Sequence, residues 1–224
     1  MTCGFVCGAL HSWSFAVHNR QRKVSVCKSQ TTTFLSGSKQ VHLRANIFQK
    51  TSTPKGERGS LVMIISNGSR FPEDVTFTTL QDGQVKEMKA SEIFNGKKVV
   101  IFGVPGAFTP SCSDKHLPGF AENLEKFKEK GIDTVVCLAA NDPYVMNAWA
   151  KQKGVEGKIL MLSDGNGAVL EELGLSVNTG NFGGKRARRF SAYVENGVVK
   201  NLNLESGTAF TEVSAAERVL SQLE

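Results

Sequence analysis

The stretch that decides the fold runs from residue 97 to residue 120 and reads KKVVIFGVPGAFTPSCSDKHLPGF. Its first part, residues 97–104, passes from two lysines into an unbroken apolar run, which predicts a central β-strand buried on both faces. A proline-rich loop follows, and apolar residues then recur at the three- and four-residue spacing of an amphipathic helix. These are Leu117, Phe120, Leu124 and Phe127. Because Pro118 lies inside this pattern, we expect it to kink the helix or to delay its regular part.

The alternation of strand and helix continues after this segment. Residues 132–140 (IDTVVCLAA) repeat the buried-strand pattern, and the next helix opens with Asp142 as N-cap and Pro143 in its first turn. Such alternation implies parallel pairing, whereas Asp-Gly at 82–83 and Asn-Gly at 196–197 predict two β-hairpins. Further elements are expected at residues 158–164 (strand), 167–174 (helix) and 212–223 (helix). The sequence thus predicts one α/β domain with a mixed central sheet and helices on both faces.

Residues 1–56 differ from the rest of the chain in charge. They hold eight of the 27 Lys and Arg residues and no Asp or Glu, and they are rich in Ser and Thr. This composition is typical of an organelle transit peptide that is removed from the mature protein. The alternative is a disordered basic tail that binds nucleic acid or membrane. Residues 57–70 are expected to form a linker with a first short strand, and residues 71–224 the folded domain.

The chain after residue 56 holds 19 basic and 21 acidic side chains, so the overall net charge of +6 comes from the N-terminal segment. We therefore expect no nucleic-acid-binding domain. No apolar run approaches the roughly 18 residues of a membrane span. This part of the chain contains Cys112, Cys137 and His116 as its only soft ligands, too few for a closed zinc site. We expect neither a metal nor a cofactor.

Cys112 falls at the junction of a predicted strand and a predicted helix. Cysteine reacts as a thiolate, and the unpaired N–H groups and dipole at a helix start favour an anion. Thr109, three residues earlier, offers a hydroxyl near the sulfur, although a threonine here also suits the helix start itself. A dithiol exchanger would need cysteine at position 109, so thioredoxin-type exchange is disfavoured. From the residues alone, a buried core role for Cys112 stays open.

Residues 105–120, PGAFTPSCSDKHLPGF, resemble the active-site segment of peroxiredoxins of the type II group and, within it, the plastid form. The pattern Pro-x-x-x-Thr-x-x-Cys is met by Pro105, Thr109 and Cys112. The similarity extends from about residue 70 to the end of the chain and includes GIDTVVCLAAND, MLSDGNG and the RRF that precedes a strand. The resemblance implies a thioredoxin-like fold.

The resemblance also implies roles for individual residues. Cys112 is the expected peroxidatic cysteine, with Pro105 and Thr109 forming its pocket. Arg189 is the expected arginine beside the sulfur, where a guanidinium favours the anion and donates to a peroxide oxygen. Cys137 is the expected resolving cysteine, although read alone it is a small hydrophobe in a buried strand. A disulfide between the two cysteines requires local unwinding around Cys112, and an external thiol can react first.

The expected function is therefore reduction of hydrogen peroxide and small alkyl hydroperoxides, with glutaredoxin or thioredoxin as the reductant. The resemblance adds a monomer–homodimer balance and, with the composition of residues 1–56, a location in the plastid stroma, with the mitochondrial matrix as the alternative. The functional alternative is a redox-sensing interaction or holdase protein in which Cys112 is oxidised without useful turnover. His116 is expected to pack at the mouth of the site rather than to act as the base of a cysteine hydrolase.

Overall fold

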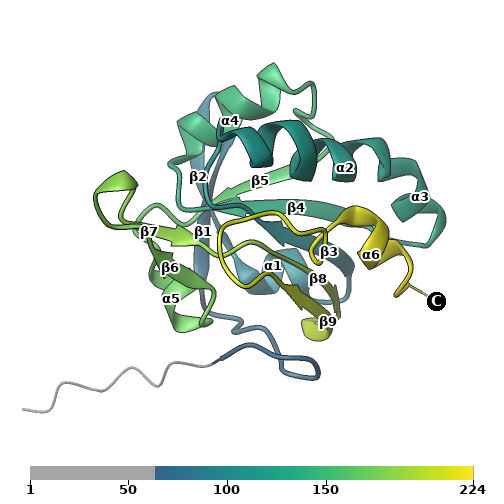
Figure 1. Cartoon of the computed structure of the whole chain (residues 1–224). Helices are drawn as coiled ribbons and strands as arrows, with labels where there is room; N and C mark the ends of the chain where they lie inside the picture. The colour runs from purple at the N-terminus through teal and green to yellow at the C-terminus, as the bar shows by residue number, and fades with distance from the viewer. Residues whose placement is uncertain (1–63, 224) are drawn as a thin grey trace, which may run out of the picture. The chain divides into compact units, whose positions relative to one another are not determined.

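The apolar run that opens the quoted segment forms the central strand β3, Lys98–Gly103, in the computed structural model, which describes residues 64–223 (Figure 1). The expected transit peptide, residues 1–56, lies outside the described residues, as do residues 57–63. Val99 and Ile101 of β3 face one hydrophobic cluster of the core and Val100 and Phe102 face the other. The strand is thus buried on both faces, as predicted.

Seven strands form one mixed sheet in the order β2-β1-β5-β4-β3-β8-β9. The three central strands β3, β4 and β5 are parallel, and all other neighbours in the sheet are antiparallel. The strands other than β3 are β1 Thr76–Gln81, β2 Gln84–Lys89, β4 Thr134–Ala139, β5 Leu160–Ser163, β8 Phe190–Glu195 and β9 Val198–Leu204. The predicted mixed sheet is therefore confirmed.

Helices cover both faces of this sheet (Figure 1). On one face lie α2 Leu117–Glu122, α3 Leu124–Glu129, α4 Pro143–Gln152 and α6 Ala216–Leu220. On the other lie α1 Ala90–Phe94 and α5 Ala168–Glu172. The predicted two-sided arrangement is confirmed, but the last helix is shorter than expected. Residues 212–215 belong instead to the loop that precedes α6.

Local signals in the sequence place several of these elements. The Asp142 carboxylate accepts hydrogen bonds from the backbone N–H groups of Tyr144 and Val145, both at 3.0 Å, and so caps α4 as predicted. Both hairpin turns have positive φ at their two central residues, which Asp or Asn followed by Gly tolerates. One of these turns joins β1 to β2 and the other joins β8 to β9.

Two features were not predicted. Strands β6 Ser176–Asn178 and β7 Lys185–Ala187 pair as a separate two-stranded sheet, joined through the short 3₁₀-helix η2, Gly180–Phe182. In addition, within the range 57–70, where a linker and a first strand were expected, residues 64–69 are not a strand, and residues 57–63 lie outside the described residues. This segment is joined to the domain by backbone hydrogen bonds from Ile65 to Leu173 and from Gly68 to Val199, and by an isolated bridge between Arg70 and Val198.

Candidate active site

Cys112 lies where the chain leaves β3 and turns into a helix. Helical backbone begins at Pro110, and residues 112–116 form one π-helical turn, η1, ahead of α2. The Leu117 N–H bonds the Cys112 carbonyl, which is the five-residue spacing of this wider turn. Pro118 is the second residue of α2 and follows this wider turn directly, so the regular helix begins only at Leu117. The expected delay of the regular helix is therefore confirmed.

The sulfur of Cys112 is fully buried and touches the guanidinium of Arg189. Arg189 Nη2 lies 3.3 Å from Cys112 Sγ, although the two residues are 77 positions apart. The Arg189 side chain is 2% exposed and precedes β8, which is hydrogen-bonded to β3 in the antiparallel direction. Because β3 ends beside the start of β8, the sheet itself brings this arginine to the cysteine.

Backbone and side-chain acceptors fix the guanidinium in this position. Arg189 Nε and Nη2 both donate to the Thr208 carbonyl at 3.1 Å, and Nη1 donates to His116 Nδ1 at 3.1 Å. No carboxylate pairs with it among residues 64–223. Its positive charge is thus directed at Cys112 without an ion-pair partner to offset it.

His116 is a buried neutral imidazole and not a residue at the mouth of the site, so that expectation was wrong. Burial, and secondly the charge of Arg189, lowers the pKa of His116 to about 3. Since arginine can only donate, Nδ1 accepts from it, and Nε2 then carries the proton and donates to the Ser214 carbonyl at 3.0 Å. With both ring nitrogens engaged, His116 holds Arg189 in place and has no free nitrogen to act as a general base.

The loop after β9 supplies the two carbonyls that hold Arg189 and His116. This loop is tied to the buried carboxylate of Glu205, which accepts from the backbone N–H and the hydroxyl of both Thr211 and Ser214. Burial acts to raise the pKa of Glu205, but these hydrogen bonds outweigh burial and lower it. Sequence reasoning missed this loop because backbone carbonyls carry no residue-specific signal.

A pocket of about 450 Å³ is lined by Pro105, Thr109 and Arg189, the last of which contacts the buried Cys112 sulfur. The three expected neighbours of the cysteine therefore do converge. The Thr109 hydroxyl donates to the Gly106 carbonyl at 2.9 Å rather than to Cys112, so in this structure it braces the loop. The other lining residues are Gly106, Ala107, Pro110, Ser111, Asn141, Thr179, Phe182, Arg186 and Thr208. A larger hollow, of about 770 Å³, contains none of the expected site residues.

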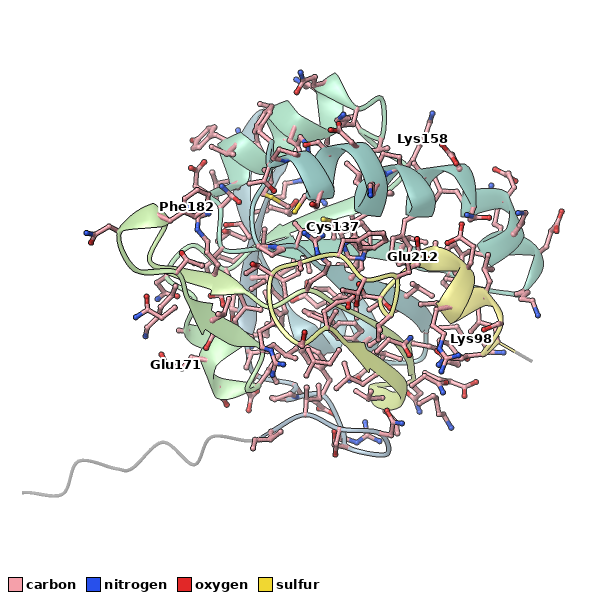
Figure 2. All side chains as sticks on the ribbon, in the orientation of Figure 1. Lys98, Cys137, Lys158, Glu171, Phe182 and Glu212 are labelled. Carbon is pink, nitrogen blue, oxygen red and sulfur yellow. The ribbon has the colours of Figure 1, made fainter. Side chains whose placement is uncertain are left out.

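Cys137 lies in the central strand β4, opposite Phe102 of β3 and Met161 of β5 (Figure 2). It belongs to the same buried cluster as Cys112, so both side chains lie on the same face of the sheet, and both cysteines are free thiols. Burial, and secondly the neighbouring Cys112, raises the pKa of the Cys137 thiol well above its ordinary value. In this conformation Cys137 is therefore a protonated thiol within the core.

The described residues show neither a metal cluster nor a membrane span. Within residues 64–223, no group of three or more His, Cys, Asp or Glu side chains is arranged to hold a metal ion. No helix in the same range has the length and apolarity needed to cross a bilayer.

Comparison with known proteins gives consistent relatives. The family model described as Redoxin matches residues 66–220. The chain is 42% identical over 163 residues to Peroxiredoxin-2E, chloroplastic, of Arabidopsis thaliana, which covers 71% of this chain and 69% of that protein. It is 44% identical over 134 residues to Peroxiredoxin-2F, mitochondrial, of the same plant, covering 59% of this chain and 67% of that one. The crystal structure of reduced Prx3 from Vibrio vulnificus in complex with hydrogen peroxide matches with a TM-score of 0.69 and 42% identity, over 72% of this chain and 100% of that one.

These findings first define the class, a thioredoxin-like α/β domain that matches the Redoxin family model. The chain belongs to the peroxiredoxin family, and the relatives named above include plant members of its type II group. It is accordingly a thiol-dependent peroxidase, an oxidoreductase.

Proposed function

We propose that Cys112 is the peroxidatic cysteine and that Arg189, Thr109 and Pro105 form its substrate site. The observation that carries this proposal is the 3.3 Å contact from Arg189 Nη2 to Cys112 Sγ, because Arg189 also lines the pocket that holds Thr109 and Pro105. A guanidinium held this close places a fixed positive charge beside the reacting sulfur. Its N–H groups also offer hydrogen bonds to a peroxide oxygen.

The reaction is oxygen transfer to sulfur. The Cys112 thiolate attacks the terminal oxygen of a hydroperoxide, so that an S–O bond forms while the O–O bond breaks. The sulfur is oxidised to sulfenic acid, and the other oxygen leaves as hydroxide or alkoxide and takes a proton from water. Negative charge moves from sulfur to the leaving oxygen during this step, and Arg189 stabilises it as it moves.

Resolution proceeds by thiol attack on the sulfenic acid, which forms a disulfide and releases water. We propose Cys137 as the resolving thiol, in competition with an external thiol. Cys137 is held in a strand with partners on both sides, whereas Cys112 opens a short π-helical turn. The turn around Cys112 is therefore the part that unwinds, because fewer hydrogen bonds break there than in β4.

Peroxide consumption with a thiol donor tests the assignment. Cys112→Ser is expected to abolish turnover with hydrogen peroxide and with alkyl hydroperoxides, and retained activity would overturn the proposal. In Cys137→Ser, loss of turnover with thioredoxin together with retained turnover with glutaredoxin would assign Cys137 to intramolecular resolution. Equal activity of this variant and the wild type with both reductants would show that Cys137 is dispensable.

A stopped-flow measurement separates turnover from redox sensing. The wild-type protein is expected to form sulfenic acid much faster than a free thiol does, because Arg189 stabilises the transition state. A rate no faster than that of a free thiol would favour the sensing or holdase alternative.

We propose a plastid location for the protein, with the mitochondrial matrix as the alternative. The support is the basic, acid-free composition of residues 1–56, together with relatives that are named chloroplastic and, in one case, mitochondrial. A fluorescent protein fused to residues 1–60 is expected to enter the plastid, and a cytosolic signal would contradict the proposal.

A further inference from the structure

The pocket lined by Arg189, Thr109 and Pro105 is much larger than hydrogen peroxide needs. Its volume is about 450 Å³, whereas one water molecule takes a share of about 30 Å³ in the liquid, and hydrogen peroxide has only one more heavy atom. The space beyond the reacting oxygens is lined by residues that have no role in the peroxide chemistry, among them Asn141, Thr179, Phe182 and Arg186. That space can hold the organic part of a hydroperoxide.

Arg186 places a second guanidinium over this space. Its Nε donates to the Gly183 carbonyl at 2.9 Å, which fixes the side chain across the η2 loop. Its Nη1 lies 3.7 Å from the point that a Cβ on Gly106 would occupy, so the guanidinium lies over the active-site loop between Pro105 and Thr109. It is therefore fixed at its base and directed to the pocket.

The two arginines of the pocket differ in what they already bind. Arg189 is engaged by Cys112, His116 and Thr208. For Arg186, no hydrogen bond or ion pair joins either η nitrogen to another residue within 64–223. The neighbouring acid Glu171 is paired with Lys185 instead, and none of the residues that line the pocket is acidic. The pocket thus has open cationic donors and no anion to occupy them.

We propose that Arg186 is an anion subsite that binds a carboxylate on the carbon chain of the substrate. The preferred organic substrates are then hydroperoxides that carry a carboxylate, with the peroxide at Cys112 and Arg189 and the carboxylate at Arg186. Phe182, which is 82% exposed at the rim of the pocket, offers an apolar surface to the carbon chain between them (Figure 2). This inference rests on the proposed function of Cys112.

Single-turnover oxidation of the reduced protein provides the test. It involves no reducing thiol, so any effect of negative charge comes from the peroxide and not from an anionic thiol that binds at the same place. The substrates are ω-hydroperoxy carboxylates of increasing chain length and their methyl esters, and the readout is the ratio of the two rate constants at each length. In the wild type this ratio is expected to reach about three to ten at one favoured length. In Arg186→Gln it is expected to fall to about one. Arg186→Lys keeps the positive charge, and its ratio of rate constants is expected to stay close to that of the wild type.

Lys185→Gln is the matched control, since it removes the same charge one residue away from a side chain that does not line the pocket. Its ratio is expected to equal that of the wild type. Equal loss of the ratio in Lys185→Gln and Arg186→Gln would indicate a diffuse charge effect and overturn the subsite, as would equal loss in Arg186→Lys and Arg186→Gln. Hydrogen peroxide is measured in parallel. If it oxidises Cys112 rapidly while the wild-type ratio is about one, only the subsite fails. If no peroxide oxidises Cys112, the proposed function fails.

Discussion

Acidification should destabilise the protein through one buried imidazole. In the unfolded chain His116 titrates near its ordinary pKa of 6.5, whereas burial and the charge of Arg189 lower the pKa in the folded protein to about 3. Between these values the unfolded state takes up a proton that the folded state excludes, so the free energy of unfolding falls as the pH falls. This contribution is complete above the unfolded pKa and decreases down to the folded one.

The expected magnitude follows from the two pKa values. At about pH 5 the unfolded state gains about 2 kcal/mol from protonation of His116, while the folded state gains almost nothing. That is a large share of the 5–15 kcal/mol by which a domain of this kind is typically stable. His116 is 1% exposed, so little solvent screening reduces this value. Protonation would also turn the Nδ1 acceptor into a donor that faces Arg189.

The comparison uses His116→Gln, because glutamine offers an acceptor to Arg189 and a donor to Ser214 but does not titrate. Urea unfolding of the full-length wild type and variant is followed by circular dichroism from neutral pH down to about pH 5, a range in which the His116 contribution changes by about 2 kcal/mol. The wild type should lose about 2 kcal/mol more than the variant, and groups common to both proteins cancel in the difference. A parallel loss in both proteins would refute the buried neutral assignment.

Three further substitutions test other contacts. Arg189→Lys should slow sulfenic acid formation by hydrogen peroxide about a hundredfold in stopped-flow measurements, because lysine cannot reach Cys112, His116 and Thr208 at once; a rate within a few-fold of wild type would contradict the role of the guanidinium. Gly103→Ala should lower the free energy of unfolding by about 1–3 kcal/mol, because the added Cβ would lie 2.1 Å from the Phe190 ring. An unchanged thermal midpoint would show that the ring moves aside without measurable cost. Glu205→Gln should lower the free energy of unfolding by about 1–3 kcal/mol at neutral pH. The difference from the wild type should shrink in acid, because the pKa of the Glu205 carboxyl is lowered in the folded protein and its stabilising contribution is lost as it protonates. A difference that grows in acid would contradict this role of the carboxylate.

The elements that sequence analysis predicted correctly have local causes. The β3 strand follows from an unbroken apolar run, the α4 start from an aspartate and a proline, and the hairpins from residues that tolerate positive φ. Each depends on neighbours a few positions away. The β6–β7 pair was missed because three-residue strands leave no readable alternation in a segment rich in glycine and basic residues.

The candidate site divides in the same way. Cys112, Pro105 and Thr109 share one short segment and could be recognised together, and Arg189 was found through the resemblance. The role of His116 was not predicted, because a histidine one turn after a cysteine has the same spacing whether it is exposed or buried. Its burial depends on Phe102 from β3, Phe120 from α2 and Phe210 from the last loop, whose rings pack around the imidazole.

By itself, the sequence determined where most of the strands and helices form, which cysteine opens a helix, and which family the chain resembles, because these depend on side-chain identity over short spans. Only the tertiary structure decided that Arg189 touches the Cys112 sulfur and that His116 and the Thr208 carbonyl hold it there. The physical reason is that antiparallel pairing of β3 with β8 brings residues 77 positions apart into contact. Every residue has a backbone carbonyl, and only the fold determines which of them face Arg189 and His116 as hydrogen-bond acceptors.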